Sequence, residues 1–462
     1  NKVRLMQYIR IGAYAVAWCI ILMVVVDIFT PLEAQAIPPF SRKYDVNCSV
    51  CHTKPPRLNT FGERFLENGY QMPGTEDGGV IKKRRLGDLT LDTVGNYLGA
   101  RLRGNVQSFD FEKDGDGSAG NPEDRTEIGF PQTFSLYTAG TLTTNVGIFT
   151  EMLFNFKGSV FTTERAFVTF DNVGSYDVFH IRIGRIDPSA FSSYPNRRQQ
   201  LDRVRGDSAN QFGNAFKQQT INRIPLVPNA FGSKFYGLFK RTNGQVISPD
   251  KQSLFFSDRE VGLDIHGRPF GDWFLYQVGI LNGAEEGFGD SNNPKDWYVM
   301  FRVDYGESRY FTANLSTFAY FGNNNAKVTS VAEVSRRQYG LAGNVRYKMV
   351  DIYGAFVIDH VADLPPSLAS SFDDTATGLT LEADVIATDR LLLSMRYDHL
   401  DAGGTRATKK SNSLLAFQVK YFLSSNIALY LRDDFNVQKD EGGSSGPRTF
   451  RNGFFIGADL DF

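Results

Sequence analysis

The sequence predicts a mainly β fold, a closed antiparallel barrel of about sixteen strands behind a small N-terminal segment of helix and irregular structure. Two patterns carry this prediction. Short segments with period-two alternation recur from about Thr90 to the C-terminus, and the gaps between them are alternately tight and long. The chain is also rich in Phe, Tyr and Gly, with a mean hydropathy of -0.28. That composition is typical of a barrel with an aromatic outer girdle and a wet interior.

The clearest alternation is in "WYVMFRVDY", from Trp297 to Tyr305. Its aromatic and branched residues fall on one face, and Arg302 and Asp304 fall on the other. The segments 391–399 and 414–423 repeat this pattern. Apolar residues on one face and charge on the other indicate a strand between lipid and water. A soluble β-sandwich is the alternative, since periodicity alone does not distinguish lipid from a protein core.

Tight gaps lie at 143–145, 306–308, 388–390 and 424–426, with longer polar gaps between them. Bacterial outer-membrane barrels have short periplasmic turns and long outer loops, so the rhythm predicts such a barrel. The longest gap, from Pro188 to about Gln252, contains a hairpin-like "KFYGLFKRTNG". We expect this gap to fold over or into the lumen.

The last residues, "FFIGADLDF", place every second side chain from Phe454 to Phe462 on one face and end on the aromatic. This arrangement looks like the terminal β-signal by which outer-membrane barrels are recognised for assembly. A strand that ends at Phe462 would pair with the first strand and remove the free edges of the sheet.

The first thirty-six residues have the layout of a secretory signal peptide: a basic start, an apolar run from Ile11 to Val26 and the small residues Ala34 and Ala36 before a cleavage point. A permanent membrane anchor is the alternative. We therefore divide the chain into a signal peptide (1–36), a head (37–87) and a barrel (88–462). After residue 36 no apolar run is long enough for a spanning helix. The net charge of -1 gives no indication of nucleic-acid binding.

Cleavage would remove Cys19 and leave Cys48 and Cys51 as the only cysteines of an exported chain. Together with His52 they form C-x-x-C-H, the pattern of covalent haem c attachment. Cys48 and Cys51 would form thioethers to the two vinyl groups of one porphyrin, and His52 would be the proximal iron ligand. Three alternatives are weaker. A structural zinc site usually needs four protein ligands, and the chain has no second cysteine pair, while a thioredoxin-like redox pair would lie in a βαβ unit, which is absent. A simple disulfide between Cys48 and Cys51 is possible but gives His52 no role.

The distal iron ligand is less clearly marked. A short helix is expected from about Asn59 to Asn68, ended by Gly69, and Met72 follows it. A Met72 thioether would raise the haem potential, although a methionine packed on the porphyrin edge or the barrel wall is the alternative.

Four further histidines lie in barrel segments: His180, His266, His360 and His399. We expect His180 and His399 to be surface residues at strand ends or facing water.

The segments "PFSRKYDVNCSVCH" and "FGERFLENGY" followed by a barrel resemble the fused outer-membrane monohaem cytochrome–porins associated with extracellular iron oxidation. The resemblance covers nearly the whole chain. It implies one covalent haem c, a bacterial outer-membrane location and electron transfer from extracellular Fe²⁺ to a periplasmic carrier cytochrome, an Fe(II) oxidase-type activity.

A head of roughly fifty residues is too small for a core of its own. We therefore expect it on the periplasmic side or within the lumen, plugging the barrel and placing the haem partway across the membrane. Two rival functions stay open: a porin-type solute channel with a haem head, and electron export to an extracellular acceptor.

Two charged groups occur in the predicted loops. An acidic group would attract divalent cations, or would be a solvated loop. It comprises Asp110, Glu112, Asp114, Asp116, Glu123 and Asp124. A basic group would line a constriction, contact haem propionates or bind lipopolysaccharide. It comprises Arg197, Arg198, Arg203 and Arg205.

Overall fold

The computed structural model describes the head, the barrel strands and their short links. The described residues are 39–72, 84–86, 89–91, 93–111, 125–143, 145–156, 160–174, 177–192, 200–201, 234–235, 240–242, 245–248, 252–253, 260–282, 295–306, 310–324, 334–362, 375–401, 411–437 and 450–462. The predicted signal peptide, the basic loop group and all of the acidic group except Asp110 lie outside them.

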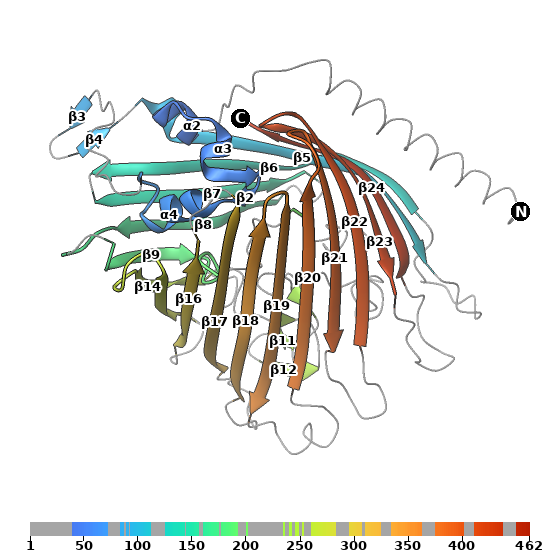
Figure 1. Cartoon of the computed structure of the whole chain (residues 1–462). Coiled ribbons are helices and arrows are strands. Elements are labelled where there is room, and N and C mark those ends of the chain that lie inside the picture. The colour runs from blue at the N-terminus through green and yellow to red at the C-terminus, as the bar shows by residue number, and fades with distance from the viewer. Residues whose placement is uncertain are drawn as a thin grey trace, which may run out of the picture.

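Sixteen of the described strands form one closed barrel, with antiparallel pairing between all neighbours (Figure 1). The predicted fold class and strand number are therefore confirmed. In chain order the strands are β5 (Leu98–Phe111), β6 (Arg125–Thr143), β7 (Val146–Asn155), β8 (Val160–Phe170), β9 (His180–Ile186), β14 (Glu260–Gly267), β15 (Phe274–Leu281), β16 (Asp296–Tyr305), β17 (Phe311–Asn324), β18 (Val334–Tyr347), β19 (Val350–Ala362), β20 (Thr375–Ile386), β21 (Leu391–Asp401), β22 (Ser411–Ser424), β23 (Ile427–Asn436) and β24 (Phe450–Asp461).

The barrel closes where β9 pairs with β14 and where the last strand, β24, pairs with the first, β5. At the end of β24 the backbone of Phe462 exchanges two hydrogen bonds with that of Ala100. The last strand therefore leaves no free edge beside β5, as "FFIGADLDF" predicted.

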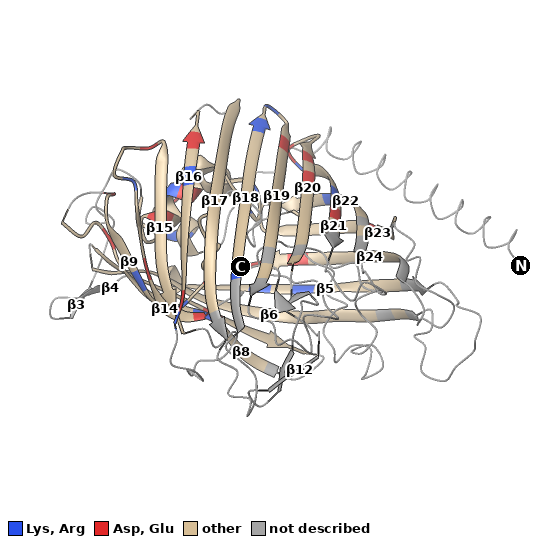
Figure 2. Cartoon of the chain, turned by 90° about the horizontal axis from the view of Figure 1, so that it is seen from below, with Lys and Arg blue, Asp and Glu red and all other residues tan. Residues whose placement is uncertain are grey.

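The predicted alternation is present in β16. Trp297 and Phe301 are 47% and 43% exposed on the outer face, whereas Tyr298 and Arg302 are 0% and 2% exposed on the inner face. Charged residues are scattered among strands that are otherwise mostly tan in Figure 2. Apolar side chains therefore cover the outside of the barrel, and polar and aromatic side chains fill its inside.

Inward-facing aromatic rings lie over glycines on neighbouring strands and fix the register of the barrel. Phe318 is directly opposite Gly340, and Tyr298 is directly opposite Gly279. A Cβ atom at Gly340 would lie 2.0 Å from Cζ of Phe318, so only glycine leaves room for that ring.

The head lies at the end of the barrel where the strand links are short. It comprises α2 (Pro39–Tyr44), α3 (Cys48–Cys51), β1 (His52–Lys54), β2 (Arg57–Leu58) and α4 (Thr60–Glu67). Arg64 pairs with Asp177 in the β8–β9 link and with Asp272 in the β14–β15 link. Lys54 donates to the carbonyl of Asp389 in the β20–β21 link. These contacts place the head across the short-link mouth of the barrel (Figure 1).

The described residues also form four two-stranded sheets outside the barrel sheet, one of which pairs β1 with β2 in the head. In two others, β3 (Arg84–Leu86) pairs with β4 (Leu89–Leu91), and β10 (Lys234–Phe235) pairs with β13 (Gln252–Ser253). In addition, β11 (Lys240–Thr242) pairs with β12 (Gln245–Ser248), which confirms a hairpin near "KRTNG". The 3-10 helix η2 (Val94–Asn96) precedes β5.

The described beginning of the longest gap lies inside the barrel. Phe191 is buried, and its carbonyl accepts from Arg302 Nη1 at 2.9 Å. Further along, Gln200 donates through Nε2 to the carbonyl of Lys54 at 2.7 Å, and its own carbonyl accepts from Gln418 Nε2 at 3.1 Å. The prediction that this gap enters the lumen is correct for these residues.

Gly340→Ala should destabilise the barrel by about 1–3 kcal/mol, because the new methyl group overlaps the Phe318 ring in a filled interior. Gly343→Ala, on the same strand, is the control, since its Cβ would have its nearest neighbours at 3.4 Å. The measurement is the temperature at which the heat-modifiable form is lost on a gel. Equal behaviour of the two variants would contradict the role of the ring-over-glycine contact.

Candidate functional site

The two cysteines of the head lie one helical turn apart. They begin and end α3, and both thiols are unpaired. Residues three apart on a helical turn share a face, so the two sulfur atoms project from the same side. Burial raises the pKa of Cys51 to about 11, and burial also raises the pKa of Cys48. Both thiols are therefore neutral at pH 7. Ser49 and Val50, between them, are exposed.

His52 directly follows this turn and is its C-cap, with its backbone N–H donating to the carbonyl of Cys48. The residue is half-buried, but Nδ1 of its ring is buried and has no hydrogen-bond partner. Burial lowers the pKa of His52 to about 4, and the backbone of Arg57 next to the ring offsets this only in part. The imidazole is therefore neutral at physiological pH.

The helix α4 follows the predicted boundaries closely. Asn59 is its N-cap and accepts from the backbone N–H of Gly62 at 2.9 Å, and Asn68 is its C-cap. Gly69 has a φ of +63°, the left-handed conformation that ends helices. The expected helix from about Asn59 to Asn68 ended by Gly69 is confirmed.

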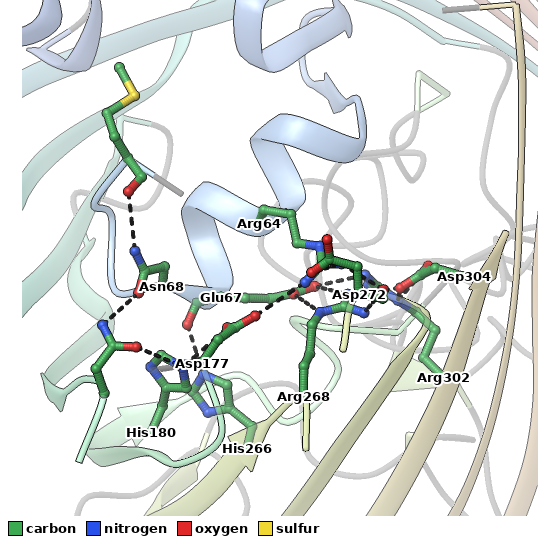
Figure 3. Close-up of polar contacts among 12 residues, drawn as sticks. Arg64, Glu67, Asn68, Asp177, His180, His266, Arg268, Asp272, Arg302 and Asp304 are labelled. Atoms are coloured by element: carbon green, nitrogen blue, oxygen red, sulfur yellow. Dashed lines mark hydrogen bonds and ion pairs between the residues drawn. The ribbon is translucent and has the colours of Figure 1, made fainter. Parts of the chain in front are cut away.

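One face of α4 carries a carboxylate into the inner wall of the barrel. Glu67 is 2% exposed and accepts from Arg268 Nε at 2.8 Å and from Arg302 Nη2 at 2.7 Å (Figure 3). Arg302 Nη1 also pairs with Glu63, one turn earlier on α4, at 3.1 Å. Asp304 accepts from both arginines, at 2.7 and 3.0 Å.

The pKa of Glu67 is well below its usual range. Burial alone would raise it, but the guanidinium groups of Arg268 and Arg302 outweigh burial. The buried carboxylate is therefore charged and paired, which is the arrangement that offsets its loss of hydration.

A second contact joins β2 to β19, three strands along the wall from β16. The Arg57 guanidinium is buried 4.6 Å from the centre of the Tyr353 ring, and its Nε lies 3.6 Å from Asp351. Arg57 Nη1 is also 3.6 Å from Glu63 of α4. This arginine therefore links two elements of the head to β19.

The head and the barrel share one hydrophobic core. Tyr70, just after α4, stacks on Phe149 of β7 at 5.2 Å and on Phe40 of α2 at 5.5 Å. Phe149 continues the stack to Phe167 of β8 at 5.4 Å. Phe65 packs in the same cluster. The expectation that the head lacks a core of its own agrees with this packing, because inward-facing residues of the barrel complete it.

Met72 lies at the end of the described head. Its side chain is partly buried against the shared core, and its carbonyl accepts from Asn68 Nδ2 at 3.4 Å. Iron ligation by Met72 stays a prediction.

His180 begins β9, so the predicted strand-end position is correct, but the prediction that it is a surface histidine is wrong. His180 is 0% exposed, and its ring stacks on His266 with centroids 5.0 Å apart (Figure 3). His180 contacts Asp171 and Asp177, while His266 Nε2 lies 3.0 Å from the carbonyl of Glu67. Both rings face inward, as strand alternation allows, but the docked head covers them and excludes water.

His399 and His360 lie in strands and are half-buried, each with a ring nitrogen within hydrogen-bond distance of a hydroxyl. His399 contacts Ser413 Oγ at 2.8 Å, and His360 contacts Thr375 Oγ1 at 3.2 Å. His399 is therefore not a freely solvated surface residue.

Sequence reasoning missed the ion pairs that hold the head. A partial signal exists, because Glu63 and Glu67 are four residues apart on an amphipathic helix and therefore share a face. Arg268 and Arg302 also occupy inward positions of strands or their ends. The sequence alone gives no indication that Glu63 and Glu67 of the head contact Arg268 and Arg302 of the barrel.

Among the described residues, no cluster of three or more His, Cys, Asp or Glu side chains has the geometry of a metal site. Within the same part of the chain, no helix has the length and apolar character needed to span a membrane.

Comparison with solved structures finds outer-membrane barrels. The outer membrane channel DcaP of Acinetobacter baumannii has 10% sequence identity and a TM-score of 0.50, over 79% of this chain and 96% of that chain. An anion-selective porin from Comamonas acidovorans has 13% identity and a TM-score of 0.45, over 79% and 98%. OmpTdeltaL8, a loop deletion mutant of an outer membrane protein of Vibrio cholerae, has 11% identity and a TM-score of 0.46, over 79% and 98%.

No protein-family model matches this chain, and no curated protein matches it in sequence. At these identities the likeness to DcaP concerns the fold, a closed porin-like barrel.

Glu67→Gln should release the head from the barrel mouth, because Arg268 and Arg302 would lose their shared carboxylate. Breaking a buried ion pair of this kind costs about 3–5 kcal/mol. The measurement is the rate at which a protease cleaves the head in detergent micelles. Asp45→Asn, the same loss of charge at an exposed head residue, is the control.

The same contact predicts a pH dependence. Glu67 has a lower pKa in the folded protein than the value near 4.3 of an unfolded chain, so its stabilisation is complete above about pH 4.3 and declines as the pH falls further. Head cleavage in the wild type should therefore accelerate below that pH, and Glu67→Gln should lack this component. A variant as resistant as the wild type at pH 7 would contradict the ion-pair account.

Proposed function

We propose that this chain is a bacterial outer-membrane electron-transfer protein. One haem c, attached to Cys48 and Cys51 with His52 on the iron, would pass electrons from extracellular Fe²⁺ to a periplasmic carrier cytochrome. The observation that carries the proposal is the C-x-x-C-H turn held inside a barrel mouth by buried ion pairs.

The outer face of the barrel supports a membrane location. Large apolar side chains such as Trp297, Leu315 and Leu341 are about half exposed there. In outer-membrane barrels the short turns are periplasmic, so the short-link mouth that holds the head would face the periplasm.

The residues of the turn fit a covalently attached haem. Two unpaired thiols on one face of a single helical turn match the spacing of two thioethers. Metal ligation needs a neutral imidazole, and the lowered pKa of His52 provides one. The His52 ring has a buried Nδ1 with no hydrogen-bond partner, so at this nitrogen the imidazole is not committed to another group of the described chain.

When bound, a haem c supplies a one-electron carrier. The chain would contribute the rest: Cys48 and Cys51 would hold the porphyrin, His52 would ligate the iron, and the barrel wall would exclude bulk water on the inner side. The exposed Ser49 and Val50 lie on the open side of the turn, where a periplasmic partner would approach.

We further propose that the head closes the mouth of the barrel to solutes. Its contacts reach well-separated parts of the wall: β6 through Lys43, β16 through Glu67, β18 through Thr53 and β19 through Arg57. Contacts so widely distributed support a plug that keeps ferric product outside while electrons cross.

A porin-type solute channel is the second candidate, favoured by the fold shared with the DcaP channel. Conductance in planar bilayers separates the two. Open channels of porin size in the wild type would favour the channel, and their appearance only after Glu67→Gln would favour the plug.

The wild type, made with a haem-attachment apparatus, should give a haem-stained band at its own mass on denaturing gels, and Cys51→Ala should lose most of it. Rapid mixing of the oxidised protein with Fe²⁺ should reduce the haem. If instead only the reduced protein reacts, passing its electron to an external acceptor, the direction would be electron export. The absence of a haem-stained band in the wild type would overturn the proposal.

Met72 is proposed as the distal ligand, because a thioether favours the ferrous state and so raises the potential. Met72→Ala should remove the near-infrared charge-transfer band of thioether ligation and lower the midpoint potential. Met152→Ala, at a methionine of β7, is the control. An unchanged spectrum and potential would assign the sixth position to another group.

A further inference from the structure

Asn59 occupies a position that joins the cysteine turn to α4. The turn is too short to satisfy its own carbonyl groups, since the last four carbonyls of any helix lack partners within it. In this protein the carbonyl of Cys48 accepts from the backbone N–H of His52. The other three all accept from Asn59.

The hydrogen bonds of Asn59 account for these three carbonyls individually. Its Nδ2 donates to the carbonyl of Val50 at 2.9 Å and to that of Ser49 at 3.3 Å. Its backbone N–H donates to the carbonyl of Cys51 at 2.9 Å. One residue therefore satisfies every carbonyl of the turn that His52 does not.

The other end of the same side chain holds α4. Asn59 Oδ1 accepts from the N–H of Gly62 at 2.9 Å. Gly62 itself packs so closely on the turn that a Cβ atom would lie 2.1 Å from the carbonyl oxygen of Cys51. The side-chain amide of Asn59 therefore forms a polar bridge between the cysteine turn and α4. The two elements pack so closely that position 62 has no room for a residue larger than glycine.

We propose that Asn59 is the positioning residue of the haem-attachment turn, fixing Cys48, Cys51 and His52 relative to α4. This inference rests on the proposed function. A haem held at three points on one short turn requires the two sulfur atoms and the imidazole to keep a fixed mutual arrangement. A turn of four residues does not supply this rigidity alone, because isolated helical turns are unstable. Since α4 is anchored to the barrel wall through Glu67, Asn59 transmits that anchorage to the turn.

A purely structural role of Asn59 as the N-cap of α4 makes a different prediction from the bridge. Asn59→Asp retains an oxygen that accepts from Gly62 N–H, and aspartate is as good an N-cap as asparagine. It removes both Nδ2 donors and places a carboxylate beside two carbonyl oxygens. Asn59→Ser also retains a capping oxygen without the donors and adds no charge.

The test uses the full chain in detergent micelles without haem, and measures how fast the Cys48 and Cys51 thiols react with a maleimide. Cys19 is replaced by Ser throughout. Loss of the bridge should allow the turn to open, so that Asn59→Asp and Asn59→Ser react about tenfold faster than the parent. Asn47→Ala, at the other end of the same turn where no side-chain cap exists, should react at the parental rate.

Barrel assembly is checked for each variant by heat-modifiability, and Asn59→Ser replaces Asn59→Asp if the charged variant does not assemble. Asn59→Ala, which loses the capping oxygen as well as the Nδ2 donors, is measured beside them. Parental labelling rates in Asn59→Asp and Asn59→Ser would overturn the proposal, and faster labelling in Asn59→Ala alone would assign Asn59 to capping.

In protein that carries haem, the midpoint potential of Asn59→Ser should differ from that of the parent while Asn47→Ala leaves it unchanged. The labelling experiment contains no haem, so its outcome is independent of whether the wild type attaches one. Failure of haem attachment in the wild type would refute the proposed function and would leave the labelling result as a separate test of the bridge.

Discussion

The structure depends on one buried carboxylate, Glu67, held between Arg268 and Arg302. A charge with 2% exposure is tolerated only when it is paired, so α4 requires these arginines to stay docked. Arg268 and Arg302 depend on α4 in turn. Without α4 they would face the lumen and would keep only Asp304 as a carboxylate partner at this contact. A head of about fifty residues, too small for its own core, thereby becomes part of the barrel interior.

This anchorage determines where the C-x-x-C-H turn lies. The wall fixes α4, and Asn59 and Gly62 fix the cysteine turn on α4. Cys48, Cys51 and His52 therefore have a defined place at the short-link mouth. A redox centre there would have one side open to the periplasm and the apolar band of the barrel, about 25 Å tall, on the other. The described first part of the longest gap, at Phe191 and Gln200, adds a further layer inside the barrel next to the head.

The sequence predicted well those features that depend on local periodicity. The alternation of β16, the short links, the closing strand at Phe462 and the helix after Asn59 all follow from patterns within about ten residues. The long-range pairings could not be predicted. Glu67 and Arg302 are 235 residues apart, and their contact depends on the register of many strands. His180 was misjudged for the same reason: alternation gives its inward direction but not the head that covers it.

We propose that electrons cross the outer membrane through the docked head. The most direct test reconstitutes haem-bearing protein in vesicles that enclose an oxidised soluble cytochrome c, and adds Fe²⁺ with an impermeant ferric chelator outside. Reduction of the enclosed cytochrome without entry of iron, lost with Cys51→Ala, is the result that the account predicts. Reduction that requires iron to enter the vesicles, or no reduction by a haem-loaded and correctly oriented protein, would contradict it.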